Sequence, residues 1–216
     1  MARFYLVRHG ATDLNNDSNV SQDRIRGWRD VPLNEEGRNH AKETAKSLKG
    51  KGIGIIIASD LARARETAEI VGEAIGIKPV LSKKLRPWDL GVLTGKSTKE
   101  AIPKIVEYIK EPDLIVPKGE SFNKFKTRAF AGLADAFDKA GDEKLCIVTH
   151  HRLERLIKAW IAAGQPADHN KIDLSVFKAK GEPPGNAEII TLEPENLRKI
   201  RKETTRGAVE RAIREG

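Results

Sequence analysis

The stretch "IGIIIAS" at residues 53–59 leaves the fewest choices of fold. A strand with one face in water alternates apolar and polar residues, and this run of consecutive isoleucines does not. Both of its faces must therefore be covered, which is typical of a strand inside a parallel sheet. Residues 4–7 and residues 144–150 ("KLCIVTH") are similar apolar runs, so we expect three buried strands of this kind.

Helical patterns separate these strands. Residues 32–50 predict a first helix, for which Asn34 can act as the N-cap. Further helical patterns cover residues 60–76, 97–110, 121–140 and 152–164, residues 78–96 are extended and loop-like, and residues 173–180 and 187–194 read as extended. Alternating strands and helices predict an α/β fold, a three-layer sandwich whose mostly parallel central sheet has helices on both faces. We expect one domain over residues 1–216, with a charged, helical tail from about residue 195.

The composition indicates in which cellular compartment the protein works and which classes of partner it binds. No apolar run approaches the roughly 18 residues that a membrane span needs, the N-terminus has no signal-peptide pattern, and the single cysteine, Cys146, fits a reducing compartment. We therefore expect a cytoplasmic protein without membrane contact. The net charge of +8 is spread along the chain, which favours small anionic substrates or solubility over nucleic acid as its explanation. The sequence leaves the oligomeric state open, a homodimer included.

Basic side chains follow all three strands. Arg8 and His9 end the first strand, Arg63 lies one helical turn beyond the end of the second, and His150 and His151 end the third. Ligands of open α/β sheets bind beyond the carboxyl ends of the strands. If these strands are neighbours, guanidinium and imidazole groups meet in one crevice, and such a site attracts a dianion such as phosphate.

A histidine in this crevice can act as a nucleophile. Free imidazole has a pKa of about 6.5 and is mostly neutral near pH 7, and nearby Arg8 and Arg63 oppose its protonation. The histidine can take a phosphoryl group and lose it to water, while the cations stabilise the transition state. We expect no metal and no cofactor. Gly10, which lacks a Cβ, is expected to let the backbone approach the ligand.

The motifs resemble those of the histidine phosphatase superfamily, which includes the cofactor-dependent phosphoglycerate mutases. The similar segments are, in order, "LVRHGATDLN", "GWRDVPLNEEGRNHA", "SDLARARETA", "GESF" and "VTHH". The resemblance implies a phosphoglycerate mutase-like fold and a phosphorylated His9. It also implies that Arg8, Arg63 and His150 hold the phosphoryl group, with Asn15 as a supporting donor.

The segment that should supply the proton donor departs from the family pattern. Members commonly have Leu-Arg-Glu there, and this chain reads "LRPWDLG", so Pro87 stands in the place of the Glu. Asp89 is the nearest carboxylate and is predicted as the proton donor, with Glu120 of "GES" as the competing candidate and as a residue facing the crevice. His151 stands where the family usually has Gly, and it either narrows the site or adds a phosphate donor.

These observations predict a metal-independent phosphomonoesterase of the histidine acid phosphatase type, acting on a small-molecule phosphomonoester through a phosphohistidine. One alternative is a phosphoglycerate mutase that uses the same intermediate. The other is a non-catalytic phosphate-binding protein, which the missing Glu suggests.

Overall fold

The computed structural model describes residues 2–14, 23–166, 168, 187–192, 195, 196, 198 and 199. Its sheet consists of β1 (Ala2–Arg8), β2 (Ile53–Ser59), β3 (Val80–Ser82), β4 (Lys144–Thr149) and β5 (Ala187–Leu192). Its helices are α1 (Glu35–Leu48), α2 (Ala62–Ile75), α3 (Thr98–Lys110), α4 (Phe122–Ala140) and α5 (His151–Ala162). Every strand and helix predicted within these residues is present. The predicted extended run at residues 173–180 lies outside them.

The strands form one sheet in the order β3-β2-β4-β1-β5. β4 lies between β1 and β2 and is parallel to both, and β3 is parallel to β2. Only β5 runs antiparallel to its neighbour, β1. The predicted mostly parallel sheet is confirmed, and the three apolar runs are its adjacent central strands.

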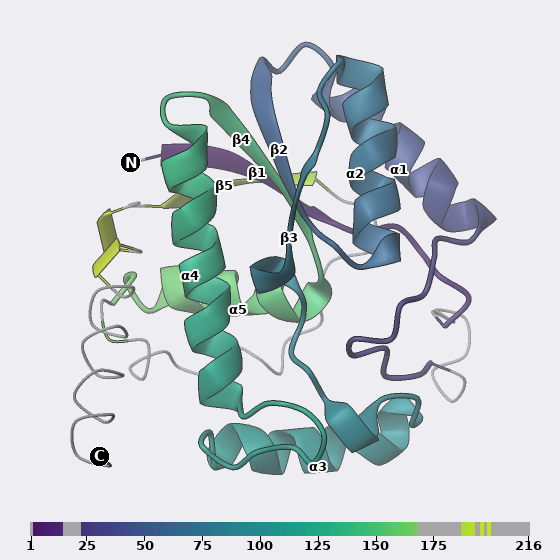
Figure 1. Ribbon diagram of the computed structural model, residues 1–216, viewed down its shortest axis with the longest axis vertical. Coiled ribbons are helices and arrows are strands. Elements are labelled where there is room, and N and C mark those ends of the chain that lie inside the picture. Colours follow the sequence, from purple (N-terminus) through teal and green to yellow (C-terminus); the bar gives the residue numbers. More distant parts are fainter. Residues whose placement is uncertain are drawn as a thin grey trace.

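Alternate residues of the central strands bury their side chains on opposite faces of the sheet. Ile56 packs with the buried residues of α1 and α2, whereas its neighbour Ile57 packs with those of α4 and α5. Figure 1 shows these two helix layers on either side of the sheet. Burial on both faces explains why the second strand is apolar at consecutive positions.

Side-chain caps fix where the helices begin. The Asn34 side chain accepts a hydrogen bond from the Gly37 N–H (2.8 Å), as the sequence predicts. Ser97 and Ser121 cap α3 and α4 in the same way. His150 directly follows β4, and α5 begins at the next residue, so β4 passes into α5 without a loop.

The segment at residues 78–96 is more regular than the sequence predicts. It contributes the short edge strand β3 and two single turns of 3-10 helix, at Lys83–Leu85 and Gly91–Leu93. β3 has too few residues to show a periodic pattern. This segment becomes a strand because it pairs with β2.

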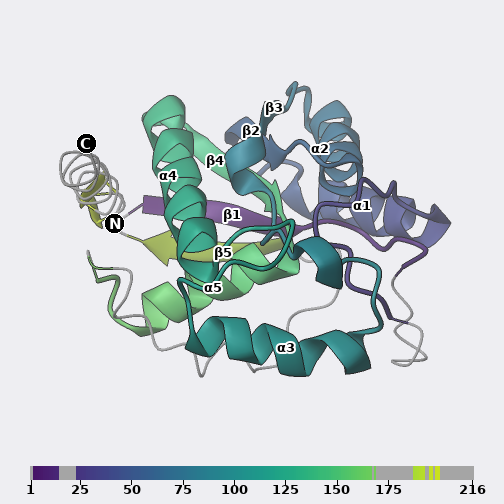
Figure 2. The same cartoon turned by 60° about the horizontal axis from the view of Figure 1, so that its bottom comes forward.

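Helix α3 lies apart from both helix layers, at the end of the molecule where the central strands finish (Figures 1 and 2). Its first residue is tied to the loop between β1 and α1, because the Thr98 N–H and hydroxyl both donate to the Asp23 carbonyl (2.8 and 3.0 Å). α3 therefore faces the carboxyl ends of the strands. Within the described residues, no helix is both long enough and apolar enough to cross a membrane.

Candidate active site

The sheet brings together the strand ends that carry the basic residues. β1 and β4 are in register at Arg8 and Thr149, and the His9 N–H donates to the Thr149 carbonyl at 2.9 Å. The imidazole rings of His9 and His150, which follow these strands, are both 2% exposed, and their centroids lie 5.1 Å apart. The predicted convergence of the first and third strand ends is present.

The His9 ring is held in one tautomer. Its Nδ1 lies 2.7 Å from the Gly10 carbonyl oxygen. A carbonyl oxygen only accepts hydrogen bonds, so Nδ1 carries the proton and Nε2 keeps its lone pair. Burial lowers the pKa of His9 well below 6.5, and Arg63, Arg26 and Arg8 lower it further. The ring is a neutral base with a free lone pair at pH 7.

Gly10 is required for the packing of the loop that follows β1. A Cβ at this position would collide with the backbone of Gly37 in α1, and a Cβ on Gly37 would collide with the backbone of Ala11. The missing side chain allows the loop after β1 to pack against the start of α1. The loop is thereby fixed beside His9, and the Gly10 N–H donates to the Thr67 hydroxyl at 3.1 Å.

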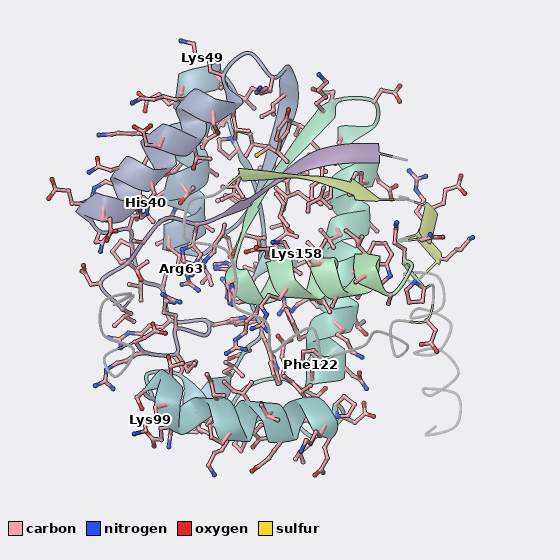
Figure 3. The ribbon with its side chains drawn as sticks, turned by 180° about the vertical axis from the view of Figure 1, so that it is seen from behind. His40, Lys49, Arg63, Lys99, Phe122 and Lys158 are labelled. Atoms are coloured by element: carbon pink, nitrogen blue, oxygen red, sulfur yellow. The ribbon has the colours of Figure 1, made fainter. Side chains whose placement is uncertain are left out.

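Arg63 brings a buried guanidinium to the site from the first turn of α2. It is 1% exposed, and its Nη1 and Nη2 donate to the carbonyls of Arg29 and Gly27 at 2.9 and 3.0 Å. Its Nε is buried and has no hydrogen-bond partner in the described part of the chain. Burial lowers the pKa of Arg63 to about 9, and Arg26 contributes to this shift. Figure 3 shows Arg63 between α2 and α3.

His150 is oriented by Ser59, the last residue of β2. Its Nε2 lies 2.8 Å from the Ser59 hydroxyl, and its Nδ1 is buried without a partner among the described residues. Burial lowers the pKa of His150 well below 6.5, with Arg63 as the next cause. Because a serine hydroxyl can donate or accept, this neutral ring can present either an N–H or a lone pair at Nδ1.

These groups border a cavity of about 730 Å³. Its basic lining residues are His9, Arg24, Arg26, Arg63, Lys110, His150, His151, Arg152 and Arg155. Asp23 is the one acidic residue among its described lining residues. α2 and α5 both begin at this edge of the sheet, and the positive N-terminal ends of their helix dipoles add to the positive potential in the cavity. Such a cavity favours an anionic ligand, as the sequence predicts.

Arg8 and His151 flank the two buried histidines. Arg8 is close enough to lower the pKa of both His9 and His151, although it is not among the residues that line the cavity. His151 is on the cavity wall, and burial followed by Arg8 lowers its pKa to about 3. Asn15 lies outside the described residues.

The structure places neither predicted proton donor on the cavity wall. Pro87 and Trp88 line the cavity, but Asp89 and Glu120 do not. The Asp89 carboxylate accepts the Gly91 N–H at 3.1 Å. Burial raises the pKa of Asp89, and the Gly91 hydrogen bond opposes that shift. The raised pKa suits an acid, whereas the placement does not.

Glu120 is part of a structural ion pair. Its carboxylate binds Arg128 and accepts the Asp89 N–H at 3.0 Å. Arg128 also donates to the carbonyls of Lys84, Arg86 and Pro87 (2.9, 3.0 and 3.0 Å). The pair therefore fixes the segment that forms the Pro87 and Trp88 wall. This geometry corrects the expectation that Glu120 faces the crevice.

The sequence patterns did not predict six charged residues of the cavity, namely Asp23, Arg24, Arg26, Lys110, Arg152 and Arg155. A signal existed for two of them, because "HHRLER" places Arg152 and Arg155 directly after the third strand. No group of three His, Cys, Asp or Glu side chains suited to a metal ion occurs among the described residues.

Known proteins resemble this chain over most of its length. The model of the histidine phosphatase superfamily (branch 1) matches residues 4–180. The "Probable phosphoglycerate mutase GpmB" of Klebsiella pneumoniae subsp. pneumoniae is 33% identical over 155 residues, which are 69% of this chain and 70% of that protein. The same-named protein of Yersinia pestis is 32% identical over the same lengths.

Solved structures show the same fold. TTHB049 from Thermus thermophilus has a TM-score of 0.62 and 27% identity, covering 87% of this chain and 92% of its own. A mycobacterial glucosyl-3-phosphoglycerate phosphatase has a TM-score of 0.70 and 23% identity, covering 88% and 93%. The family resemblance of the sequence motifs and the predicted fold class are confirmed.

Proposed function

We propose that this chain, which belongs to the histidine phosphatase superfamily, is a metal-independent phosphomonoester hydrolase that acts through a phosphohistidine at His9. The observation that carries the proposal is the His9–Gly10 hydrogen bond, because it leaves a lone pair on Nε2 of a buried, neutral ring. That ring borders a cavity lined by cations.

The reaction has two steps. The Nε2 lone pair attacks phosphorus, the bond to the ester oxygen breaks, and the leaving oxygen takes a proton. The Nδ1 proton stays on the ring, where the Gly10 carbonyl stabilises the positive charge that develops. Water then attacks the phosphoryl group and releases phosphate and neutral His9.

The cations would act on the charge of the transferring group. Arg63 and His150 line the cavity together with His9, and the Arg63 Nε–H and the His150 Nδ1 position would provide donors for phosphoryl oxygens. Arg8 does not line the cavity and would act on His9 through its charge. Donors fixed in a buried site stabilise a transition state more than water does, because they need no reorganisation. This is the chemical reason to expect turnover without a metal.

The proton donor stays a prediction. Asp89 keeps this role in the proposal because it directly follows Pro87 and Trp88, which line the cavity, and because burial raises its pKa. If Asp89 is the donor, Asp89→Asn slows alkyl phosphates much more than 4-nitrophenyl phosphate, whose leaving group needs no proton. Equal slowing of both substrates would exclude Asp89 as the acid.

A mutase is the second candidate, and the name of the GpmB relatives favours it. With 3-phosphoglycerate as substrate, we expect free phosphate. Formation of 2-phosphoglycerate without free phosphate would establish the mutase instead.

The hydrolase is tested by rapid acid or base quench with 4-nitrophenyl phosphate in the presence of a chelator. We expect an acid-labile, base-stable phosphoenzyme in the wild type and none in His9→Ala. Binding of inorganic phosphate without any turnover would support a non-catalytic phosphate-binding protein.

A further inference from the structure

The turn that binds Arg63 is a separate structural unit of the loop after β1. Residues 26–29 form this turn, which is closed by a backbone hydrogen bond of 2.9 Å between its first and last residues. Arg63 donates to the carbonyls of Gly27 and Arg29, the residues on either side of Trp28. The direction of the Arg63 guanidinium therefore depends on where the turn lies.

The Trp28 side chain ties this turn to the segment that ends at Pro87. Its indole N–H donates to the Pro87 carbonyl at 2.8 Å. The guanidinium carbons of Arg86 and Arg128 lie 4.8 and 5.3 Å from the centre of the Trp28 ring, within the range of a cation–π contact. Trp28 is thus held by one hydrogen bond and two cation–π contacts.

Both of these guanidinium groups are fixed by carboxylates. Arg86 donates hydrogen bonds of 2.7 Å to each carboxylate oxygen of Asp60, and Arg128 binds Glu120. A cation that is already fixed loses little side-chain entropy when it contacts the indole, so its contact is stronger than that of a mobile cation. The position of Trp28 is therefore set by groups outside the turn.

A further contact aligns the chain after the turn with the start of α2. Leu61, the N-cap residue of α2, makes no side-chain cap. The Asp30 carboxylate accepts the Ala62 N–H at 2.6 Å and supplies this cap from the loop. Residues 27–30 therefore connect the helix turn that carries Arg63 with the segment that carries Pro87.

Packing alone does not explain a tryptophan at position 28. Trp28 is only partly buried and belongs to neither buried core cluster, whereas Trp88 and Trp160 are fully buried in the core. The indole combines an N–H donor for a carbonyl with a ring face for cations. Both properties are used by Trp28, and a leucine of similar burial would supply neither.

We infer that Trp28 is a positioning residue for phosphoryl transfer. It holds the turn so that the Gly27 and Arg29 carbonyls keep both Nη groups of Arg63 in place, which leaves the buried Nε–H for a phosphoryl oxygen. Trp28 is not among the described residues that line the cavity, so it acts through Arg63 and not on the substrate. The inference rests on the proposed function for the role of Arg63.

Two substitutions of Trp28 test this role with 4-nitrophenyl phosphate. Trp28→Phe removes the N–H and keeps an aromatic ring, whereas Trp28→Leu removes both. We expect kcat/KM to fall about fivefold in Trp28→Phe and about 30-fold in Trp28→Leu, mainly through kcat. Wild-type kinetics in both variants would overturn the inference.

Trp160→Phe is the matched control. The Trp160 indole N–H also donates to a proline carbonyl, that of Pro166 at 2.9 Å, and it does so in the last turn of α5. We expect its kcat/KM to change by less than about twofold. A loss in Trp160→Phe equal to that in Trp28→Phe would show a general effect of removing an indole and would refute the inference.

A double-mutant cycle tests whether Trp28 acts through Arg63. Trp28→Phe should lower kcat/KM about fivefold in the wild type and have almost no effect in Arg63→Lys, because the group that it positions is already gone. A fivefold loss in both backgrounds would mean that Trp28 acts independently of Arg63, and this would overturn the inference. Trp28→Phe carries the cycle, so a failure of Trp28→Leu to fold does not affect it.

Binding of inorganic phosphate separates this inference from the proposed function. If the wild type hydrolyses no phosphomonoester, the hydrolase is overturned, and the same cycle is measured as the Kd of inorganic phosphate by calorimetry. Weaker binding in Trp28→Phe that disappears in the Arg63→Lys background would support the positioning role. Equal Kd values of the wild type and Trp28→Phe, or equal losses in both backgrounds, would refute it.

Discussion

The Nδ1 atom of His9 donates a hydrogen bond of 2.7 Å to the carbonyl oxygen of Gly10, the next residue in the chain. This bond fixes which ring nitrogen is protonated. Gly10 can hold its carbonyl there because its backbone packs against Gly37 at the start of α1. A contact between a loop and a helix thus sets the tautomer of the candidate nucleophile.

We predict that phosphorylation occurs on Nε2 of His9, because Nδ1 is already protonated and bound. Two-dimensional NMR of the quenched phosphoenzyme distinguishes the two phosphohistidine isomers. His151→Gln should leave the isomer unchanged. Phosphorus on Nδ1 would show that the Gly10 hydrogen bond does not hold during the reaction.

Arg63→Lys should lower kcat/KM by about 100-fold, because a lysine ammonium cannot hold two carbonyls and still present the Nε–H. Arg65→Lys is the matched control on the same helix, since the Arg65 side chain is 41% exposed and its ion pair with Glu69 is long, at 3.8 Å. Steady-state kinetics should show less than about a twofold change for the control. Similar losses in both variants would contradict the role of Arg63.

Glu120→Gln should lower the free energy of unfolding by about 3 kcal/mol, because Glu120 is buried and its loss leaves the partly buried charge of Arg128 unbalanced. Glu43→Gln, which breaks an exposed ion pair with Lys46, should cost less than about 1 kcal/mol. Urea unfolding measures both. A large loss of kcat in Glu120→Gln at unchanged stability would instead support the proton-donor role predicted from the sequence.

Gly10→Ala should destabilise the protein by about 3 kcal/mol, because its Cβ meets backbone atoms of Gly37, which cannot move aside. Gly54→Ala is a milder comparison, since its Cβ meets only the exposed Glu143 side chain. Thermal unfolding should rank the two variants in this order. Equal stabilities would show that the loop after β1 can shift away from α1.

His151 should make stability depend on pH. Burial and Arg8 lower its pKa to about 3 in the folded protein, while the unfolded chain titrates near 6.5. Between these values only the unfolded chain binds the proton, so the free energy of unfolding decreases as pH falls from about 6.5 toward 3. Above about pH 6.5 the residue contributes no pH dependence.

His151→Gln should therefore make the decrease in stability between pH 7.5 and pH 5 shallower than in the wild type. Urea unfolding at both pH values gives the comparison. His9 and His150 shift in the same direction and keep a residual slope in the variant. Parallel stability curves for the two proteins would contradict a lowered pKa of His151.

Several expectations from the sequence stay predictions. They include the single domain over residues 1–216 and the cytoplasmic location. The supporting role of Asn15 and the helical tail beyond residue 199 fall outside the described residues. The expectation that the C-terminal region adds a strand is confirmed by β5, which pairs with β1.

Local sequence patterns were enough to define the layers and the edge of the sheet at which the site forms. Apolar runs such as residues 53–59 require burial on both faces, and helical patterns between them supply the cover. Parallel strands end at one edge, so Arg8, His9 and His150 had to meet once these strands were neighbours. Such inferences succeed because burial and strand direction are properties of short segments.

How the side chains around that edge are used depends on contacts that form only when the chain folds. Glu120 lies within the motif "GESF" and Arg152 directly follows "VTHH", yet Glu120 pairs with Arg128 and Arg152 lines the cavity. Arg128 lies near Glu120 in the sequence, but it is held in place by the carbonyls of Lys84, Arg86 and Pro87, which are more than 40 residues away, and no periodicity records such contacts. Whether a charge holds the fold or faces a ligand depends on which group folding places beside it.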